Sequence, residues 1–218
     1  MVQIALETPA SADSLYIARD SEIEELRPAF TGDVYRHDGK LLMLVQHPCA
    51  LRRGVTMHEN ILAVEVKSTD AKPRSDWKNH AVAEMPLPAL QEGHSIADFL
   101  AVRVEKSASL IGSPRLAILS ERGVNLLMQR WVYHCSRVVV PTITYNDQTY
   151  GPFNEADLAL DWLTDRAAVL GRAEAFAEFD DWVRGPGDAG QQSRQSRLGD
   201  RQEANSVRRE ARLHLKTL

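Results

Sequence analysis

The sequence predicts an α+β fold, in which a small barrel or curled antiparallel sheet is followed by C-terminal helices. Short apolar segments joined by loops, with no helical pattern between them, fill the first half of the chain, which is typical of antiparallel strands. After Ser120 the apolar residues recur at helical spacing instead, as in Val124, Leu127 and Trp131. With 44% of its 218 residues hydrophobic, the chain can build one sizeable core with an appendage, or two small domains.

Six segments of the first half are predicted as strands. Residues 29–35 and 41–45 flank the turn signal His37-Asp38-Gly39, so we expect them to pair as a hairpin. The other four predicted strands are residues 61–66, 81–85, 99–104 and 115–119. Before the first strand, the chain is expected to form an arm with a short helix that Ser21 begins and Pro28 stops.

The second half is predicted to hold three helices and a tail. Ser120 is the expected N-cap of the first helix, and Pro141 its end. Residues 142–153 contain two turn signals, so a loop or small hairpin is expected there, with Asn154 opening a helix that Gly171 closes. We therefore divide the chain into an arm (1–28), a barrel-like domain with a packed helix (29–140), a helical extension (141–185), and a linker with a basic amphipathic tail helix (186–218).

Charge is unevenly distributed. Residues 191–218 carry six Arg and one Lys against Asp200, Glu203 and Glu210, a net +4, so the preceding 190 residues carry −8 of the total −4. Such asymmetry is typical of a chain whose tail has a specific partner, although a solvated helix of mixed charge has the same composition. The candidate residues for phosphate or nucleic-acid contact are Arg52, Arg53, Arg201, Arg208, Arg209 and Arg212.

The densest polar segment is residues 46–54, directly after an apolar strand. Cys49 could act as a nucleophile with His47 as its base and Arg52 favouring the thiolate. His47 and Cys49 could instead join His134 and Cys135 in a zinc site. On a structural interpretation, the segment only shapes a tight strand exit, its arginines pair with the acidic body, and Cys135 belongs to the apolar face of its helix.

Several classes of protein are not indicated. Two cysteines are no disulfide framework, no apolar run approaches the roughly 20 residues of a membrane span, and no signal peptide is recognisable, so a cytoplasmic protein is predicted. The sequence has no phosphate-cradling Gly-rich loop, no H-E-x-x-H and no G-x-S-x-G motif, and no cofactor is predicted.

Residues 30–35, Phe-Thr-Gly-Asp-Val-Tyr, precede a turn, a strand that ends at a polar junction, and a further strand. Over residues 29–120 this layout resembles the MazF/PemK-like toxins, which implies an SH3-like barrel and RNA cleavage. The family's first loop is long and carries a catalytic arginine, whereas here Arg36 is the only basic residue near that position. Gln46-His47-Pro48-Cys49 occupies the family's Ser/Thr position, so the barrel is expected without the nuclease. The layout is also similar to small proteins of bacterial phage-defence operons.

These observations favour a non-enzymatic accessory or adaptor protein of a bacterial defence or toxin–antitoxin type system. We expect it to bind a protein partner through the C-terminal basic helix, and to contact nucleic acid; the observations also leave a homo-oligomer open. The alternatives are a metal-independent endoribonuclease using His47 and Arg52, and a zinc-stabilised structural module.

Overall fold

The computed structural model describes residues 5–69, 77, 82–185 and 192–218. The chain divides into two compact units. The first consists of residues 1–23, 29–51 and 57–146, and the second of residues 24–28, 52–56 and 147–218.

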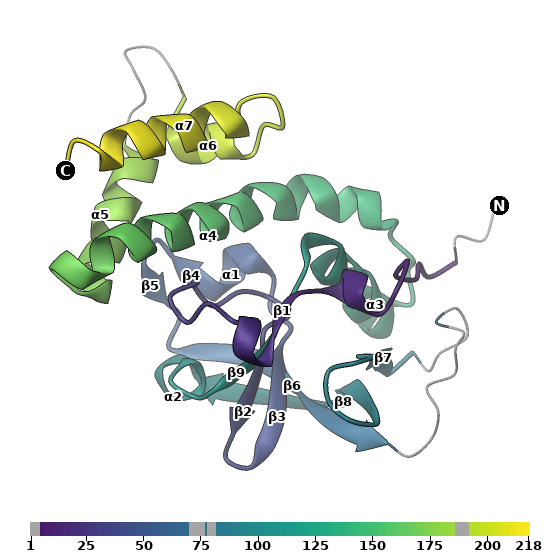
Figure 1. The fold of residues 1–218 in the computed structure, drawn as a ribbon. Helices are drawn as coiled ribbons and strands as arrows, with labels where there is room; N and C mark the ends of the chain where they lie inside the picture. The colour runs from purple at the N-terminus through teal and green to yellow at the C-terminus, as the bar shows by residue number, and fades with distance from the viewer. Residues whose placement is uncertain (1–4, 70–76, 78–81, 186–191) are drawn as a thin grey trace. The chain divides into compact units, whose positions relative to one another are not determined.

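The first unit is built on a curled antiparallel sheet of seven strands in the order β1-β9-β2-β3-β6-β8-β7 (Figure 1). This confirms the predicted fold class. The bounds of the strands are β1 Tyr16–Arg19, β2 Val34–His37, β3 Lys40–Leu44, β6 Asn60–Thr69, β7 Glu84–Pro86, β8 His94–Lys106 and β9 Arg115–Leu119. Two further short strands, β4 Arg52–Arg53 and β5 Thr56–Met57, form a separate ribbon.

The predicted hairpin is β2 paired with β3, in a register that sets Tyr35 opposite Leu42. Asp38 and Gly39 both have positive φ, of 48° and 74°, as the turn of a two-residue hairpin requires. The prediction that the first strand begins at residue 29 is wrong. The Asp33 carboxylate accepts the Phe30 N–H at 2.9 Å, so its side chain closes a turn where a strand was expected.

The principal helix of the first unit is α3, Glu121–Ser136. Ser120 caps it as predicted, because its Oγ accepts the Gly123 N–H at 3.0 Å. A Cβ at Gly123 would lie 2.4 Å from the Leu15 carbonyl oxygen, so glycine allows the first turn of the helix to approach that carbonyl. The helix ends before Pro141, at Arg137, whose φ of 61° is left-handed.

The remaining helices of the first unit are short. They are the 3₁₀ turns η1 (Asp13–Leu15) and η2 (Asp20–Glu22) and the α-helices α1 (Pro48–Leu51) and α2 (Ser107–Ile111). The prediction of a helix begun by Ser21 is therefore wrong, since Ser21 lies inside η2 and the chain turns out of that element at Ile23.

Glu7 anchors the N-terminal arm of the first unit. Its carboxylate accepts the Thr142 N–H and Oγ–H at 2.7 Å and pairs with Arg122 at 2.8 Å. Desolvation raises the pKa of Glu7, but these contacts outweigh it and lower the pKa from 4.5 to about 2. The carboxylate therefore stabilises the fold above pH 4.5, and this contribution is lost as the pH falls toward 2.

We accordingly expect the wild type to be more stable than Glu7→Gln at neutral pH, and the difference to shrink as the pH falls from 4.5 toward 2. Urea unfolding of both proteins across that range measures it. A difference that stays constant would show that the carboxylate charge is not what anchors the arm.

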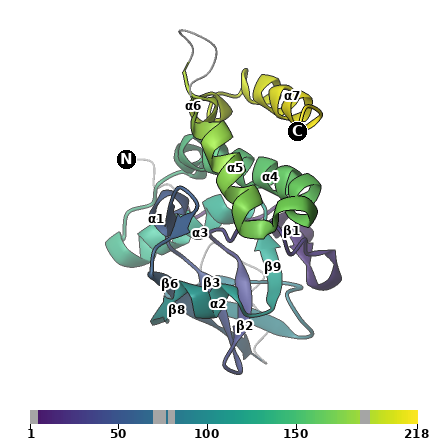
Figure 2. The same ribbon diagram turned by 90° about the vertical axis from the view of Figure 1, so that its left-hand side faces the viewer.

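Among its described residues the second unit contains four helices, of which the first, α4 (Thr142–Leu170), begins within the first unit. The others are α5 (Arg172–Arg184), α6 (Arg194–Leu198) and α7 (Ala204–Leu215). Figures 1 and 2 show α5, α6 and α7 gathered beside α4. The predicted linker falls largely on residues 186–191, outside the described residues.

The prediction of a loop over residues 142–153 is wrong, because α4 runs through both turn signals with Pro152 inside it. Asn154 is not a cap but donates from its side chain to the Tyr150 carbonyl within the helix, at 2.9 Å. A Cβ at Gly151 would lie 3.2 Å from the Gly199 Cα, so this glycine is where α4 and the end of α6 approach each other. Gly171, with φ of 84°, ends α4 as predicted.

The core of the second unit is centred on Trp162 of α4, which is fully buried. Its ring contacts Phe179 and Trp182 of α5 and His214 of α7, with centroids 5.2 to 5.8 Å apart. Buried residues of all four helices complete the cluster, namely Leu158, Ala159, Val183, Leu198, Val207 and Ala211. No helix within the described residues is long and apolar enough to cross a membrane.

Candidate phosphate-binding face

The orientation of α7 is set by its apolar residues. Val207 and Ala211 are fully buried in the core of the second unit, and Leu215 packs against it. The apolar face of the predicted amphipathic tail helix is therefore covered by the chain itself, except for Leu218, which is 53% exposed. Because this face is held down, the opposite face is exposed, and its residues are Asn205, Arg209, Arg212, Leu213 and Lys216.

Three cations lie on that exposed face, at helical spacings of three and four residues: Arg209, Arg212 and Lys216. None of them forms an ion pair within the part of the chain that the structure describes, and Arg209 has only a long contact of 3.5 Å with the Asn205 carbonyl. Arg212 and Lys216 also lie at the C-terminal end of the helix, where its dipole favours positive charge. We call these three residues the basic face of α7.

The nearby acids are paired with arginines of α6, since Arg194 lies 3.4 Å from Glu210 and Arg197 contacts both Glu203 and Glu210. Arg197 of α6 binds Glu210 through both guanidinium Nη atoms, at 2.7 and 3.3 Å, and contacts Glu203 at 2.5 Å. The hydrogen bond from Arg197 holds the pKa of Glu210 below its ordinary value, so this carboxylate stays charged and paired. Two of the three acids of the tail are thus paired with Arg197, and the basic face keeps its positive charge.

Arg208 has a different role from its neighbours. Its guanidinium is directed back into the helical unit, where it donates to Asn154 at 3.0 Å and lies 3.6 Å from the Asp157 carboxylate. The same carboxylate pairs at 2.8 Å with Arg27, which is 3% exposed. Desolvation raises the pKa of Asp157, and the two arginines oppose that shift. Arg208 is therefore committed to an internal ion-pair cluster and is not part of the basic face.

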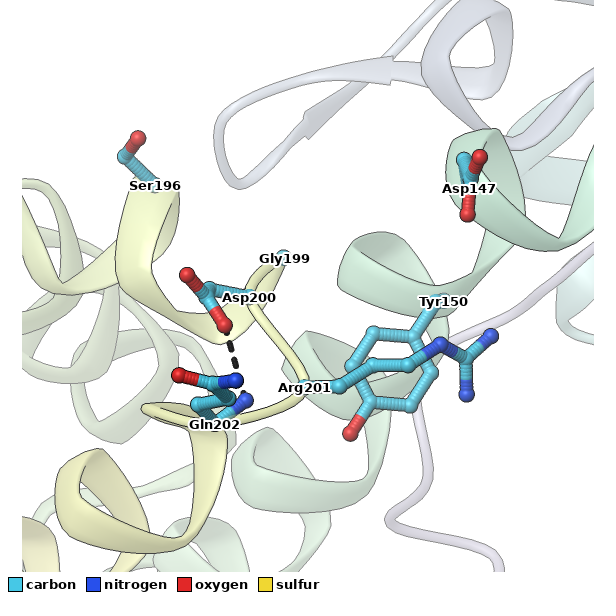
Figure 3. Close-up of a pocket in the computed structure, with 7 residues that line it drawn as sticks. All are labelled: Asp147, Tyr150, Ser196, Gly199, Asp200, Arg201 and Gln202. Atoms are coloured by element: carbon cyan, nitrogen blue, oxygen red, sulfur yellow. Dashed lines mark hydrogen bonds between the residues drawn. The ribbon is translucent and has the colours of Figure 1, made fainter.

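Arg201 lies beside an open hollow of about 700 Å³ in the loop between α6 and α7 (Figure 3). Its guanidinium carbon is 4.2 Å from the centroid of the Tyr150 ring, a cation–π contact. Asp200 accepts the Gln202 N–H at 2.7 Å, which shapes the loop. The residues lining the hollow are Asp147, Tyr150, Ser196, Gly199, Asp200, Arg201 and Gln202.

This hollow combines an aromatic ring, a stacked guanidinium and two carboxylates. A planar base can stack on such a pair, and a carboxylate can accept from an exocyclic amino group. Asp147 and Asp200 would repel a phosphate there. The hollow is thus suited to a base rather than to a phosphate.

The two arginines of the polar junction are placed differently. The guanidinium carbon of Arg52 lies 5.7 Å from the Phe176 ring centroid, so Arg52 already contacts α5 of the second unit. Arg53 is exposed. Residues 46–51 of the predicted junction belong to the first unit and residues 52–54 to the second, so the junction does not form a single site within one unit.

His47 and Cys49 belong to the first unit. The His47 Nδ1 accepts the main-chain N–H of Cys49 at 3.3 Å, a contact that leaves this nitrogen unsuited to taking the thiol proton. Desolvation lowers the pKa of His47 below 6.5, which favours the neutral imidazole at pH 7 and disfavours it as a general acid.

The four residues considered for zinc are not brought together. The His134 Nδ1 lies 3.0 Å from the Val82 carbonyl and its ring stacks on Trp131. Cys135 is exposed, so its expected place on a core-facing stripe is wrong. Among the described residues, which include all four candidates, no group of three or more His, Cys, Asp or Glu is arranged to hold a metal ion.

Sequence reasoning did not select Lys216 for this site. Lys216 follows Arg209 by seven positions, and that spacing becomes informative once Val207 and Ala211 set the buried side of the helix. No protein-family model matches the chain, and no curated protein matches it either. The resemblance to the MazF/PemK-like toxins therefore stays a prediction.

Proposed function

We propose that the protein is a non-enzymatic adaptor that binds the phosphate backbone of nucleic acid through the basic face of α7. The observation that carries this proposal is the arrangement of Arg209, Arg212 and Lys216 on one exposed helix face, while Arg197 binds Glu203 and Glu210. Cations presented in a row without acidic partners bind phosphates and release condensed counterions on doing so.

The stacked pair of Arg201 and Tyr150, in the same unit, offers a surface on which a nucleic-acid base can stack. Stacking on an aromatic ring or a guanidinium tolerates any base, so the expected binding is weakly dependent on sequence. Neither His47 nor the four zinc candidates belong to this face, so the proposal requires no catalytic or metal chemistry. The protein partner and the bacterial defence setting stay predictions.

A salt titration tests this proposal. Fluorescence anisotropy of the full chain with a labelled double-stranded DNA and a labelled single-stranded RNA should give saturable binding at low salt. For three phosphate contacts on duplex DNA, the affinity should fall roughly 40-fold between about 50 and 200 mM salt, and somewhat less on single strands.

Three results would contradict the proposal. Absence of binding to both probes at low salt removes the phosphate-binding role, and binding of poly-glutamate alone would assign the face to an acidic protein. Shortening of the labelled RNA on a gel, in a preparation free of contaminating nuclease, would contradict the non-enzymatic part.

A further inference from the structure

In the first unit, the C-terminal part of β8 has one edge to which no strand is paired among the described residues. β7 pairs with β8 from Ile96 to Asp98, and one more main-chain bond lies on each side: the Leu87 N–H donates to the Ser95 carbonyl at 2.8 Å, and the Phe99 N–H to the Ala83 carbonyl at 2.7 Å. Beyond this point β8 continues to Lys106 and, among the described residues, is paired with β6 alone. Val102 and Val104 within this segment are 44% and 68% exposed.

The hydrogen-bonding phase of this segment follows from its pairing with β6. The Ser107 N–H donates to the Glu59 carbonyl at 2.9 Å, so Ser107 is directed toward β6. The register runs unbroken from Asn60 opposite Lys106 to Val64 opposite Val102. Because main-chain groups alternate along an antiparallel strand, those of Val102, Val104 and Lys106 are directed away from the sheet. An exposed edge of this kind is a template for another strand.

The sequence of the edge is complementary to itself. When two copies of Val102-Arg-Val-Glu-Lys106 run antiparallel about a two-fold axis at Val104, the two Val104 residues face each other. Arg103 of each copy then lies opposite Glu105 of the other, and Val102 opposite the stem of Lys106. Opposite charges directly across a strand pair are favourable. Val102, Val104 and Lys106, whose main-chain groups are directed outward, all pair with the other copy in this register.

Neighbouring registers are worse. An axis at Arg103 sets two arginines against each other, and an axis at Glu105 sets two glutamates against each other. An axis at Val102 requires Leu100, but the Leu100 N–H already donates to the Asp98 carboxylate at 2.9 Å. The β6–β8 register is also broken between Val102 and Asp98, so that stretch is not a regular edge.

We propose that a second copy of this chain pairs with β8 about a two-fold axis at Val104, which makes the protein a homodimer through an extended sheet. A five-residue strand pair is small beside the roughly 800 Å² per partner of a typical stable interface, so the dimer forms reversibly and its population depends on concentration. This assembly is independent of the phosphate-binding role, which belongs to the other unit.

Sedimentation equilibrium of the full chain over a wide range of protein concentration tests the inference. The wild type should follow a monomer–dimer equilibrium. Val104→Glu places two carboxylates opposite each other and should raise the dissociation constant at least about tenfold. Val169→Glu is the matched control, because Val169 is a similarly exposed valine of the other unit, at 73%, and it should leave the equilibrium unchanged.

Charge reversal supplies a second test, in which the stability of each variant is measured as well, because Arg103 also pairs with Glu65 of its own chain at 2.7 Å. Glu105→Arg alone should weaken the dimer, and the double variant R103E/E105R should restore part of the lost affinity, because the opposite pairs form again in the reverse sense. A wild type that remains monomeric at every concentration overturns the proposal and leaves the edge to another occupant. A dimer that Val104→Glu does not weaken overturns it as well.

Discussion

Replacing Trp162 by alanine should lower the free energy of unfolding of the second unit by about 4 kcal/mol. Trp162 is fully buried and contacts rings of α5 and α7, and its indole N–H donates to Glu178 at 3.0 Å. The substitution removes these contacts, leaves a cavity among large side chains, and deprives the Glu178 carboxylate of a donor. Guanidinium unfolding followed by circular dichroism measures the loss.

Val169→Ala on the same helix is the control. Val169 is 73% exposed, so its truncation should change the stability by less than about 0.5 kcal/mol. If Trp162→Ala lay within about 1 kcal/mol of the wild type, Trp162 could not be the centre of the helical core.

This prediction bears on function because α7 depends on the core. A helix of 12 residues is marginal in water by itself, so α7 is stable because Val207 and Ala211 pack against the cluster around Trp162. Loosening that cluster should also make α7 less helical, so that Arg209, Arg212 and Lys216 no longer lie on one face. We therefore expect Trp162→Ala to lose nucleic-acid affinity along with stability, although no atom of Trp162 belongs to the face.

The sheet could be predicted from the sequence because its signals are local. The hairpin around Asp38-Gly39 and the strands at residues 61–66 and 115–119 have apolar runs and turn residues within a few positions of each other, and all are present. The Ser120 cap is equally local. Local signals were wrong where tertiary contacts decide. Gly151-Pro152 is typical of a loop, yet α4 continues through it while Gly151 makes a close approach to Gly199.

The candidate site was predictable only in part, for the same reason. Composition indicates a basic tail, but only the fold distinguishes Arg209 and Arg212, which are exposed, from Arg208, which binds Asp157 within the unit. Nor could the sequence show that Arg197 binds Glu203 and Glu210, because that contact depends on how α6 packs on α7. The role of each arginine depends on its partner, and partners are set by tertiary structure.

A second large effect, a loss of affinity for nucleic acid, is expected from the double variant R209Q/R212Q, which removes two charges from the basic face of α7. Glutamine keeps the helix propensity of arginine and removes only the charge, so α7 should fold unchanged. If both arginines contact phosphate, the affinity for double-stranded DNA should fall about tenfold or more, and the magnitude of the salt slope by about 2.

A matched control removes the same charge elsewhere. Arg36 of β2 and Arg172 of α5 are exposed and form no ion pair among the described residues. The double variant R36Q/R172Q therefore changes the net charge equally, without touching α7. A general electrostatic attraction between protein and DNA would respond to both variants alike.

The comparison of these two variants by anisotropy, at several salt concentrations, is the most direct test of the proposed function. The basic face predicts that R209Q/R212Q loses affinity and salt dependence, while R36Q/R172Q binds like the wild type. Equal losses in the two variants, or an unchanged affinity in R209Q/R212Q, would contradict it.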